Sequence, residues 1–291
     1  MIVPTGPLHY APLGALTPDP SFAPPLLSAD KRIVYAPSAS VLLNYCYQRS
    51  PSPHPSLLAV APADEKLRFI QAAAETVVAP GRDRLLRDAD ATSEAMIAAA
   101  GQHRIVAFFG HAVFDRRYPM SSRLVLADGS LHASEIVRRL RMHSDLIVLA
   151  ACESGRGHVL RGDEIMGLSR ALLYAGTTSV LATLWPVHEI PTRLLVEHFF
   201  HQIRQHSERN GDLDPALGLA RSQCWLRELT CAEIYETMTT WGAETGTSIW
   251  QELCALWQMT HPNETPKDAD RLFAHPFFWS PYILIGDRRR G

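Results

Sequence analysis

A histidine and a cysteine each follow a strongly apolar segment of this chain. The segment 104–109 (RIVAFF) leads through a glycine to His111, and the segment 145–151 (DLIVLAA) leads directly to Cys152. If the two segments form neighbouring parallel strands, both side chains emerge at the edge where open α/β sheets carry functional groups. A thiol beside an imidazole can be held partly as thiolate and attack a carbonyl carbon. The pattern therefore predicts a His/Cys dyad for nucleophilic catalysis.

The spacing between the two residues allows this arrangement. They are 152 − 111 = 41 positions apart, which accommodates one crossover connection between parallel strands. The backbone N–H groups of Ala112 and Cys152 could then hold the carbonyl oxygen of a substrate as an oxyanion hole. From the residue types alone an alternative stays open, in which Cys152 is a packed small side chain and His111 a hydrogen-bonded polar group.

The elements that must position these residues alternate along the chain. Apolar segments of strand length lie at 2–4, 56–61, 104–109, 145–151, 178–184 and 277–285. Helical spacing occupies 64–78, with Asp64 as its cap, and also 92–100, 133–141, 162–175, 190–205, 214–229 and 231–262. Apolar strands alternating with amphipathic helices are typical of a largely parallel sheet covered on both faces. We therefore expect an α/β fold in one compact unit.

Composition and charge exclude several classes of protein. The 291 residues include 28 Lys and Arg against 30 Asp and Glu, a formal charge of −2, which gives no electrostatic reason to expect nucleic acid or an anionic membrane as a partner. No lysine follows a glycine, so a phosphate loop of the G-x-x-x-x-G-K type is excluded. No apolar run approaches the roughly 20 residues that span a bilayer. We expect a soluble, cytoplasmic protein.

Other candidate sites are weaker. The five cysteines form no C-x-x-C pair, which excludes a zinc-ribbon or thioredoxin-type site. Ser169 lies near a G-x-S-x-G pattern, but within helical spacing rather than directly after a strand, so we reject it as a nucleophile. His198, His201 and His206 could share a metal ion, but no clear carboxylate partner accompanies them, and a polar helix face is favoured. Neither a metal nor an organic cofactor is expected.

The residues around Cys152 resemble a known nucleophile motif. Ala151-Cys152-Glu153-Ser154-Gly155 after an apolar strand is similar to the motif of the caspase, legumain and separase group of cysteine peptidases, in which the histidine lies some 40–50 residues upstream. More specifically, the chain resembles a CHAT domain, a caspase-like domain often joined to tetratricopeptide repeats. Further segments that fit this family in order lie at 3–10, 36–40, 119–126, 162–168, 175–177, 184–187 and 275–279.

This resemblance implies a fold, an activity and a context. The fold would be a caspase-like three-layer sandwich, with residues 1–100 forming the N-terminal part of the sheet and 101–291 bearing the dyad of His111 and Cys152. Residues 231–262 would be a helical insertion, and the chain would lack an N-terminal sensing region. The activity would be that of a regulated cysteine endopeptidase acting on a dedicated protein partner in bacterial defence or cell death. A regulatory repeat or sensor protein is a further expected partner.

The chain departs from the family pattern at two positions near the histidine, and the departure at Ala112 is the main support for an alternative function. The family usually has His-Gly where this chain has His111-Ala112, and an additional histidine where this chain has Ala107. If position 112 needs a positive φ, alanine is strained there and the oxyanion hole is impaired; with a negative φ little is lost. The alternative is a catalytically inactive caspase-like scaffold or adaptor that binds partners.

The residues after the nucleophile suggest a substrate preference. Glu153, Asp163 and Glu164 could line the pocket for the residue before the cut and favour a basic side chain there, whereas Arg156 and Arg161 could favour an acidic one. A solvated loop, with Asp163 as a helix cap, is the alternative for these residues. We expect a basic or otherwise non-acidic preference.

Overall fold

A computed structural model of the chain describes residues 1–4, 8, 11–16, 32–41, 43, 56–115, 117–151, 163–242 and 247–287. For residues 151, 163–166, 247 and 248 only the backbone is described. The elements and contacts described below are those of these residues. Within them, no helix combines the length and the apolar character that crossing a bilayer requires.

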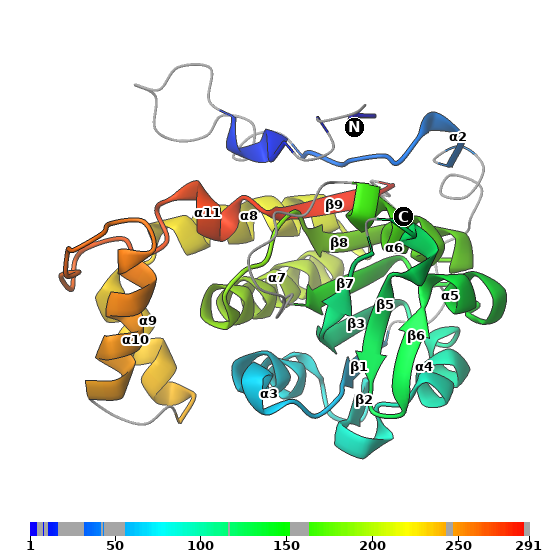
Figure 1. Ribbon diagram of the computed structural model, residues 1–291, viewed down its shortest axis with the longest axis horizontal. Helices are drawn as coiled ribbons and strands as arrows, with labels where there is room; N and C mark the ends of the chain where they lie inside the picture. The colour runs from blue at the N-terminus through cyan, green and yellow to red at the C-terminus, as the bar shows by residue number, and fades with distance from the viewer. Residues whose placement is uncertain are drawn as a thin grey trace.

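A six-stranded sheet runs through the middle of the molecule (Figure 1). Its strand order is β2-β1-β3-β7-β8-β9, and every neighbouring pair is parallel except β8 and β9, which are antiparallel. The strands are β1 (Leu57–Ala61), β2 (Arg84–Arg87), β3 (Ile105–Gly110), β7 (Leu146–Ala151), β8 (Ser179–Thr183) and β9 (Tyr282–Gly286). The expected α/β fold with a largely parallel sheet is confirmed.

Helices cover both faces of this sheet, so that the molecule has three layers. One face carries α3 (Arg68–Val77), α7 (Glu189–Asn210) and α8 (Pro215–Glu228), and the other carries α4 (Ser93–Ala100), α5 (Ala133–Arg139) and α6 (Asp163–Ala175). Successive strand residues alternate between the two faces: Phe109 packs into the first core and Phe108 into the second. Both faces are buried, which explains why the strands are continuous apolar runs rather than alternating ones.

A second, three-stranded antiparallel sheet lies beside the end of β3. It contains β4 (Ala112–Val113), β5 (Arg123–Leu126) and β6 (Gly129–His132) in that order. The hairpin between β5 and β6 turns at Ala127-Asp128, and Gly129, the first residue of β6, has a φ of 132° that favours glycine. The sequence analysis did not predict this sheet. It continues the chain directly from His111, so it helps to fix the backbone of that residue.

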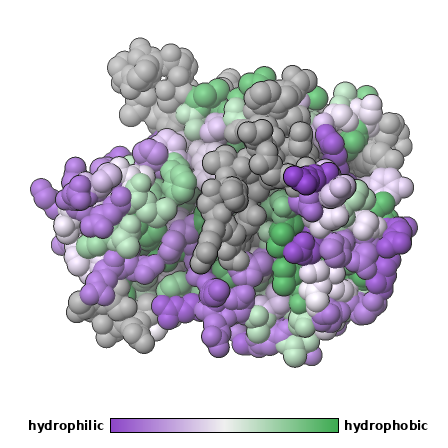
Figure 2. All heavy atoms as spheres, in the orientation of Figure 1, coloured by the Kyte–Doolittle hydropathy of each residue, from purple (hydrophilic) through white to green (hydrophobic). Residues whose placement is uncertain are grey.

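The C-terminal third contains the extra helices expected between residues 231 and 262. These are α9 (Cys231–Thr240) and α10 (Thr247–Gln258), which pack side by side (Figure 1). Figure 2 shows hydrophobic and hydrophilic side chains mixed over this part of the molecule, with hydrophilic ones along its outer margin. That this helical pair is an insertion relative to the family stays a prediction.

The expected strand 277–285 is wrong in its first half. Residues Pro276–Trp279 form a helical turn, α11, and the strand β9 begins only at Tyr282. The turn has a local cause: Pro276 stands at the first helical position, and His275 Nδ1 accepts a hydrogen bond from the Phe277 N–H.

The N-terminal residues contribute less regular structure than expected. The predicted strand 2–4 is reduced to a bridge between Ile2 and Tyr35, and Tyr35 in turn bridges to Ile285 of β9. The remaining elements are a short helix, α2 (Ala39–Val41), and 3₁₀ turns at Leu13–Ala15, Glu65–Leu67, Asp88–Asp90 and Pro119–Ser121.

Candidate functional site

The strands that lead to the predicted dyad are neighbours. β3 and β7 pair in parallel from Ile105 and Leu146 to their last residues, Gly110 and Ala151. His111 therefore leaves the sheet at the end where β7 also ends. Four residues of the predicted site, Cys152, Glu153, Arg156 and Arg161, lie outside the described residues. Asp163 and Glu164 begin α6, and only their backbone is described.

The side chain of His111 contacts a carboxylate that the sequence analysis treated only as a helix cap. Its Nε2 lies 2.8 Å from Oδ2 of Asp64, a residue in the loop that follows β1. The imidazole is mostly buried, with 12% of its surface exposed, whereas the Asp64 side chain is 30% exposed. A signal for this partner existed: β1 lies next to β3 in the sheet, so a polar residue soon after β1 reaches the edge where His111 emerges.

Both oxygens of Asp64 are held. Oδ1 accepts a hydrogen bond of 2.8 Å from the Lys66 N–H, which confirms the expected capping role, while Oδ2 contacts His111. An ionised carboxylate can only accept hydrogen bonds, so the shared proton sits on His111 Nε2. The neutral imidazole then carries its lone pair on Nδ1. Asp64 thus sets both the orientation and the tautomer of His111.

A close approach between two loops makes this contact possible. A Cβ added at Gly110 would lie 3.1 Å from Cγ of Pro62 and 2.9 Å from Cζ of Phe108, so the absence of a side chain lets the loop after β1 pack directly on the end of β3. The same loop is tied to α3, because the Gln71 side-chain amide donates a 2.6 Å hydrogen bond to the Pro62 carbonyl. Gly110 therefore brings Asp64 within reach of His111.

The backbone at His111 is hydrogen-bonded to β5. The Val125 N–H of β5 donates a 2.9 Å hydrogen bond to the His111 carbonyl, and Ala112 lies opposite Leu124. In an antiparallel ladder this places Ala112 in a non-hydrogen-bonded pair, so its N–H points away from β5. Among the described residues the non-glycine positions with positive φ are Asp88 and Asn263. Ala112 is therefore not strained in place of glycine.

The loop after β8 lies at the same end of the sheet and joins three helices. Glu189 Oε2 accepts hydrogen bonds from the Phe69 and Ile70 N–H groups at 3.0 and 3.4 Å, which ties α7 to the first turn of α3. Burial raises the pKa of the Glu189 carboxyl, which these two N–H groups partly offset. His188 Nε2 lies 3.3 Å from Oε1 of Glu252 in α10. These contacts hold α3, which follows the Asp64 loop, against α7 and α10.

The serine and histidine sites that the sequence analysis rejected make structural contacts instead. Ser169 is buried within α6 and has no preceding strand. His198 stacks on Trp225 with ring centroids 4.3 Å apart, and its Nδ1 lies 2.9 Å from Ser222 Oγ. Burial, followed by the nearby His201, lowers the pKa of His198 to about 4. His206 Nε2 instead contacts Asp212 at 3.1 Å. Within the described ranges, no three His, Cys, Asp or Glu side chains gather in a metal-binding arrangement.

Comparison with known proteins gives one family and a set of similar folds. The family model described as CHAT domain matches residues 1–287. The mouse protein "Tetratricopeptide repeat protein 28" is 30% identical over 83 residues, which are 28% of this chain and 3% of that protein. Separase in the Saccharomyces cerevisiae separase–securin complex matches with a TM-score of 0.50 and 15% identity, over 74% of this chain and 14% of that chain.

A further solved structure, the Arg-specific cysteine proteinase gingipain R, matches 86% of this chain and 50% of its own, with 11% identity and a TM-score of 0.38. The chain thus spans only a small part of the mouse protein and of separase. At 15% identity the likeness to separase concerns the fold. It agrees with the caspase-like arrangement of the six-stranded sheet.

Proposed function

This chain belongs to the CHAT-domain family, and from that premise we propose that it is a cysteine endopeptidase in which Cys152 is the nucleophile and His111 the general base. The observation that carries the proposal is the pairing of Gly110 with Ala151 at the ends of adjacent parallel strands. His111 and Cys152 are the next residues in the chain, and neighbouring strands lie about 4.8 Å apart. Asp64 serves as a positioning residue for His111.

The proposed first step is acylation. His111 Nδ1 takes the proton of the Cys152 thiol, and the thiolate forms a bond to the carbonyl carbon of the scissile peptide. The imidazolium that results is stabilised by its Nε2–H bond to the Asp64 carboxylate. The negative oxygen of the tetrahedral intermediate accepts hydrogen bonds from the Ala112 and Cys152 N–H groups. The C–N bond then breaks, and His111 returns its proton to the leaving amine.

Deacylation completes the cycle. The acyl group is now held as a thioester on Cys152, and a water molecule attacks its carbonyl carbon while His111 Nδ1 accepts the proton of that water. Breakage of the C–S bond releases the carboxylic acid and restores the thiol. Three features of the chain support this scheme: the mostly buried imidazole, the doubly held carboxylate of Asp64, and the direction of the Ala112 N–H away from β5.

The proposed substrate is a dedicated partner protein. We place Glu153, Asp163 and Glu164 near the residue before the cut, with a basic or non-acidic preference. A role in bacterial defence or cell-death signalling, in the cytoplasm, rests on the family resemblance alone. A tetratricopeptide-repeat or sensor protein is the proposed regulator, and the name of the mouse relative, which refers to such repeats, supports this.

The test of the proposal is site-selective labelling and cleavage. The whole chain is treated with a peptide bearing a thiol-reactive group and a basic residue before it, and the modified cysteine is identified by mass spectrometry. We expect selective modification of Cys152, with the rate falling at least ten-fold in His111→Ala, at the scale of general-base catalysis. Cys224→Ala is the matched control, because Cys224 is a partly exposed free thiol. A proteome extract with added tetratricopeptide-repeat partner should show cleavages that Cys152→Ala abolishes.

The alternative is an inactive caspase-like scaffold that binds partners. Its support was Ala112 in place of glycine, and the absence of a positive φ at this position weakens that support. If Cys152 reacts no faster than Cys224, and His111→Ala changes neither labelling nor cleavage, the scaffold is the better description. Retained cleavage by Cys152→Ala would also contradict the peptidase proposal.

A further inference from the structure

A polar cavity lies at the opposite end of the sheet from His111. Its volume is about 90 Å³, and it opens beside Leu57 and Ile105, the first residues of β1 and β3. The six residues of β3 span about 20 Å, so this cavity is well separated from the proposed catalytic edge. Its polar lining comes from Arg82, Arg104 and Arg204, together with Asp83 and Glu208.

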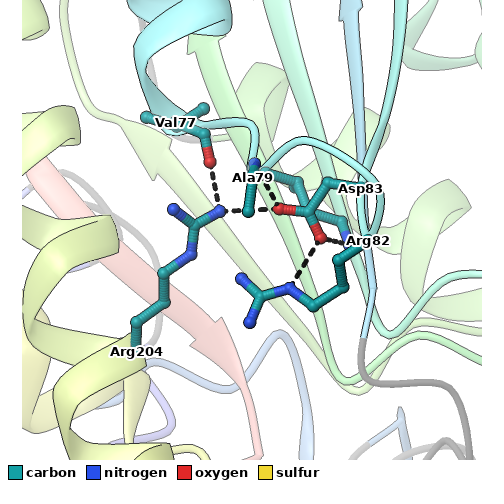
Figure 3. Close-up of polar contacts among 6 residues, drawn as sticks. Val77, Ala79, Arg82, Asp83 and Arg204 are labelled. Atoms are coloured by element: carbon teal, nitrogen blue, oxygen red, sulfur yellow. Dashed lines mark hydrogen bonds and ion pairs between the residues drawn. The ribbon is translucent and has the colours of Figure 1, made fainter.

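One buried carboxylate organises the arginines. The Asp83 side chain has no exposed surface, and its oxygens accept hydrogen bonds from the Leu57 N–H at 3.0 Å and the Ala79 N–H at 2.8 Å. The same carboxylate accepts from Arg82 Nε at 3.2 Å and Arg204 Nη2 at 2.9 Å. Figure 3 shows the two guanidinium groups on one side of the carboxylate, where Arg204 also reaches the Val77 carbonyl.

Asp83 alone does not balance the two arginines that it holds. One carboxylate faces two guanidinium groups, and the exposed Glu208 at the rim of the cavity supplies the other negative charge, whereas Arg104 is paired with Asp145 through a 2.5 Å contact. Desolvation lowers the pKa of the Arg204 guanidinium, and the neighbouring Arg82 lowers it further, although Asp83 and Glu208 act in the opposite direction. Two like charges are therefore held close together at the rim of a cavity.

The guanidinium groups also have hydrogen-bonding capacity to spare. Each arginine carries five N–H donors. The contacts within the described residues use Nε of Arg82, Nε of Arg104 and Nη2 of Arg204. The terminal nitrogens of Arg82 and Arg104 and Nη1 of Arg204 have no partner among the described residues. Apolar walls from Phe200 and Leu213 lower the local dielectric and strengthen any bond made there.

We propose that this cavity binds a small oxyanion with phosphate chemistry between Arg82, Arg104 and Arg204. Forked guanidinium donors suit tetrahedral oxyanions. The volume of about 90 Å³ exceeds the roughly 10–15 Å³ that one water requires, so a group larger than a water fits between the arginines. A single phosphate group is the occupant that we assign. Glu208 is exposed at the rim and opposes the anion unless its side chain turns outward.

Titration calorimetry of the whole chain tests this site, with sodium phosphate as the ligand and sodium chloride keeping the ionic strength constant. We expect Arg82→Gln to raise the Kd about ten-fold, because one charge-assisted donor group is lost. Glu208→Gln should lower the Kd several-fold, since it removes the opposing charge without touching a donor. Arg170→Gln, an equal charge change on exposed α6 surface, should leave the Kd unchanged.

Opposite effects of Arg82→Gln and Glu208→Gln support the site, and loss of folding cannot produce the gain expected for Glu208→Gln. Equal heats in the wild type, Arg82→Gln and Arg170→Gln would overturn it. O-phosphoserine distinguishes the two sources of this chemistry: binding of both ligands indicates that a phosphorylated side chain enters, and binding of phosphate alone indicates a free anion. Acetate that binds as tightly as phosphate would overturn the assignment to phosphate chemistry.

Discussion

The imidazole of His111 and the carboxylate of Asp64 lie 47 positions apart in the sequence, yet Nε2 and Oδ2 are 2.8 Å apart. The contact joins the loops that follow two adjacent parallel strands, β1 and β3. Since Asp64 also caps the turn that follows it, the same side chain stabilises local structure and orients a candidate general base. These two roles can be separated by substitution.

Replacement of Asp64 by Asn should lower kcat about 10²-fold, at the lower end of what general acid–base catalysis contributes. The amide oxygen can still cap the Lys66 N–H, but the side chain no longer stabilises the imidazolium. The pH profile of kcat/KM should differ from that of the wild type, because the negative charge beside the imidazole is gone. Glu65→Gln, which removes one negative charge from the adjacent residue, is the control. An unchanged pH profile with a lower Tm would show that Asp64 acts only as a cap.

Replacement of Ala112 by Pro tests the oxyanion role of a single N–H. This N–H makes no ladder bond to β5, so its removal should cost little stability while kcat falls about 10²–10³-fold. Ala112→Gly retains the N–H and should keep activity near the wild-type value. Steady-state kinetics and chemical denaturation measure the two quantities. Equal losses of activity in both variants would contradict the assignment.

Replacement of Gly110 by Ala should disturb the loop that carries Asp64. The new Cβ would lie 3.1 Å from Pro62 Cγ and 2.9 Å from Phe108 Cζ, and overpacking of this kind costs about 1–3 kcal/mol. Chemical denaturation should show this loss, and activity should fall with it. Pro62→Ala in the same chain removes one of the two close contacts and should recover part of the loss. Strict additivity of the two changes would show that the loops are not coupled.

Acid should destabilise the chain through His198. Its pKa falls from 6.5 to about 4 in the folded state, so the unfolded chain binds more protons between these two values. The free energy of unfolding must then rise as pH increases from about 4 to 6.5 and level off above it. In His198→Gln this slope should shrink, as measured by urea denaturation at several pH values. His143→Gln, at an exposed position, is the comparison; the same reduction there would argue against His198 as the source.

Most strands of the large sheet could be predicted because they are largely continuous runs of apolar residues. Residues 105–109 and 146–150 are buried on both faces of the sheet, so their continuous apolar character marks them as central strands. The spacing between the two segments allowed a crossover connection, and the structure shows the parallel pairing of β3 and β7 that this permits. The helices were found within a few residues of their ends, although α7 runs to Asn210, where Gly211 in a left-handed conformation terminates it.

The features that escaped prediction depend on long-range contacts or short segments. β4 has two residues, too few for any periodicity to appear. The turn of α11 arises from Pro276 and the His275 cap within an otherwise strand-like apolar run. Asp64 was recognised for its local hydrogen bond but not for its contact with His111, because only the order of strands in the sheet brings the two together.

The bridge at Tyr35 has a consequence for assembly. The Tyr35 N–H donates to the Leu284 carbonyl, and the Gly286 N–H donates to the Tyr35 carbonyl. These bonds occupy two of the outer backbone groups of β9, which would otherwise be a template for a strand from another molecule. The segment that contains Tyr35 thus covers part of the free edge of β9. A variant that lacks this segment would expose that edge and become prone to intermolecular strand pairing.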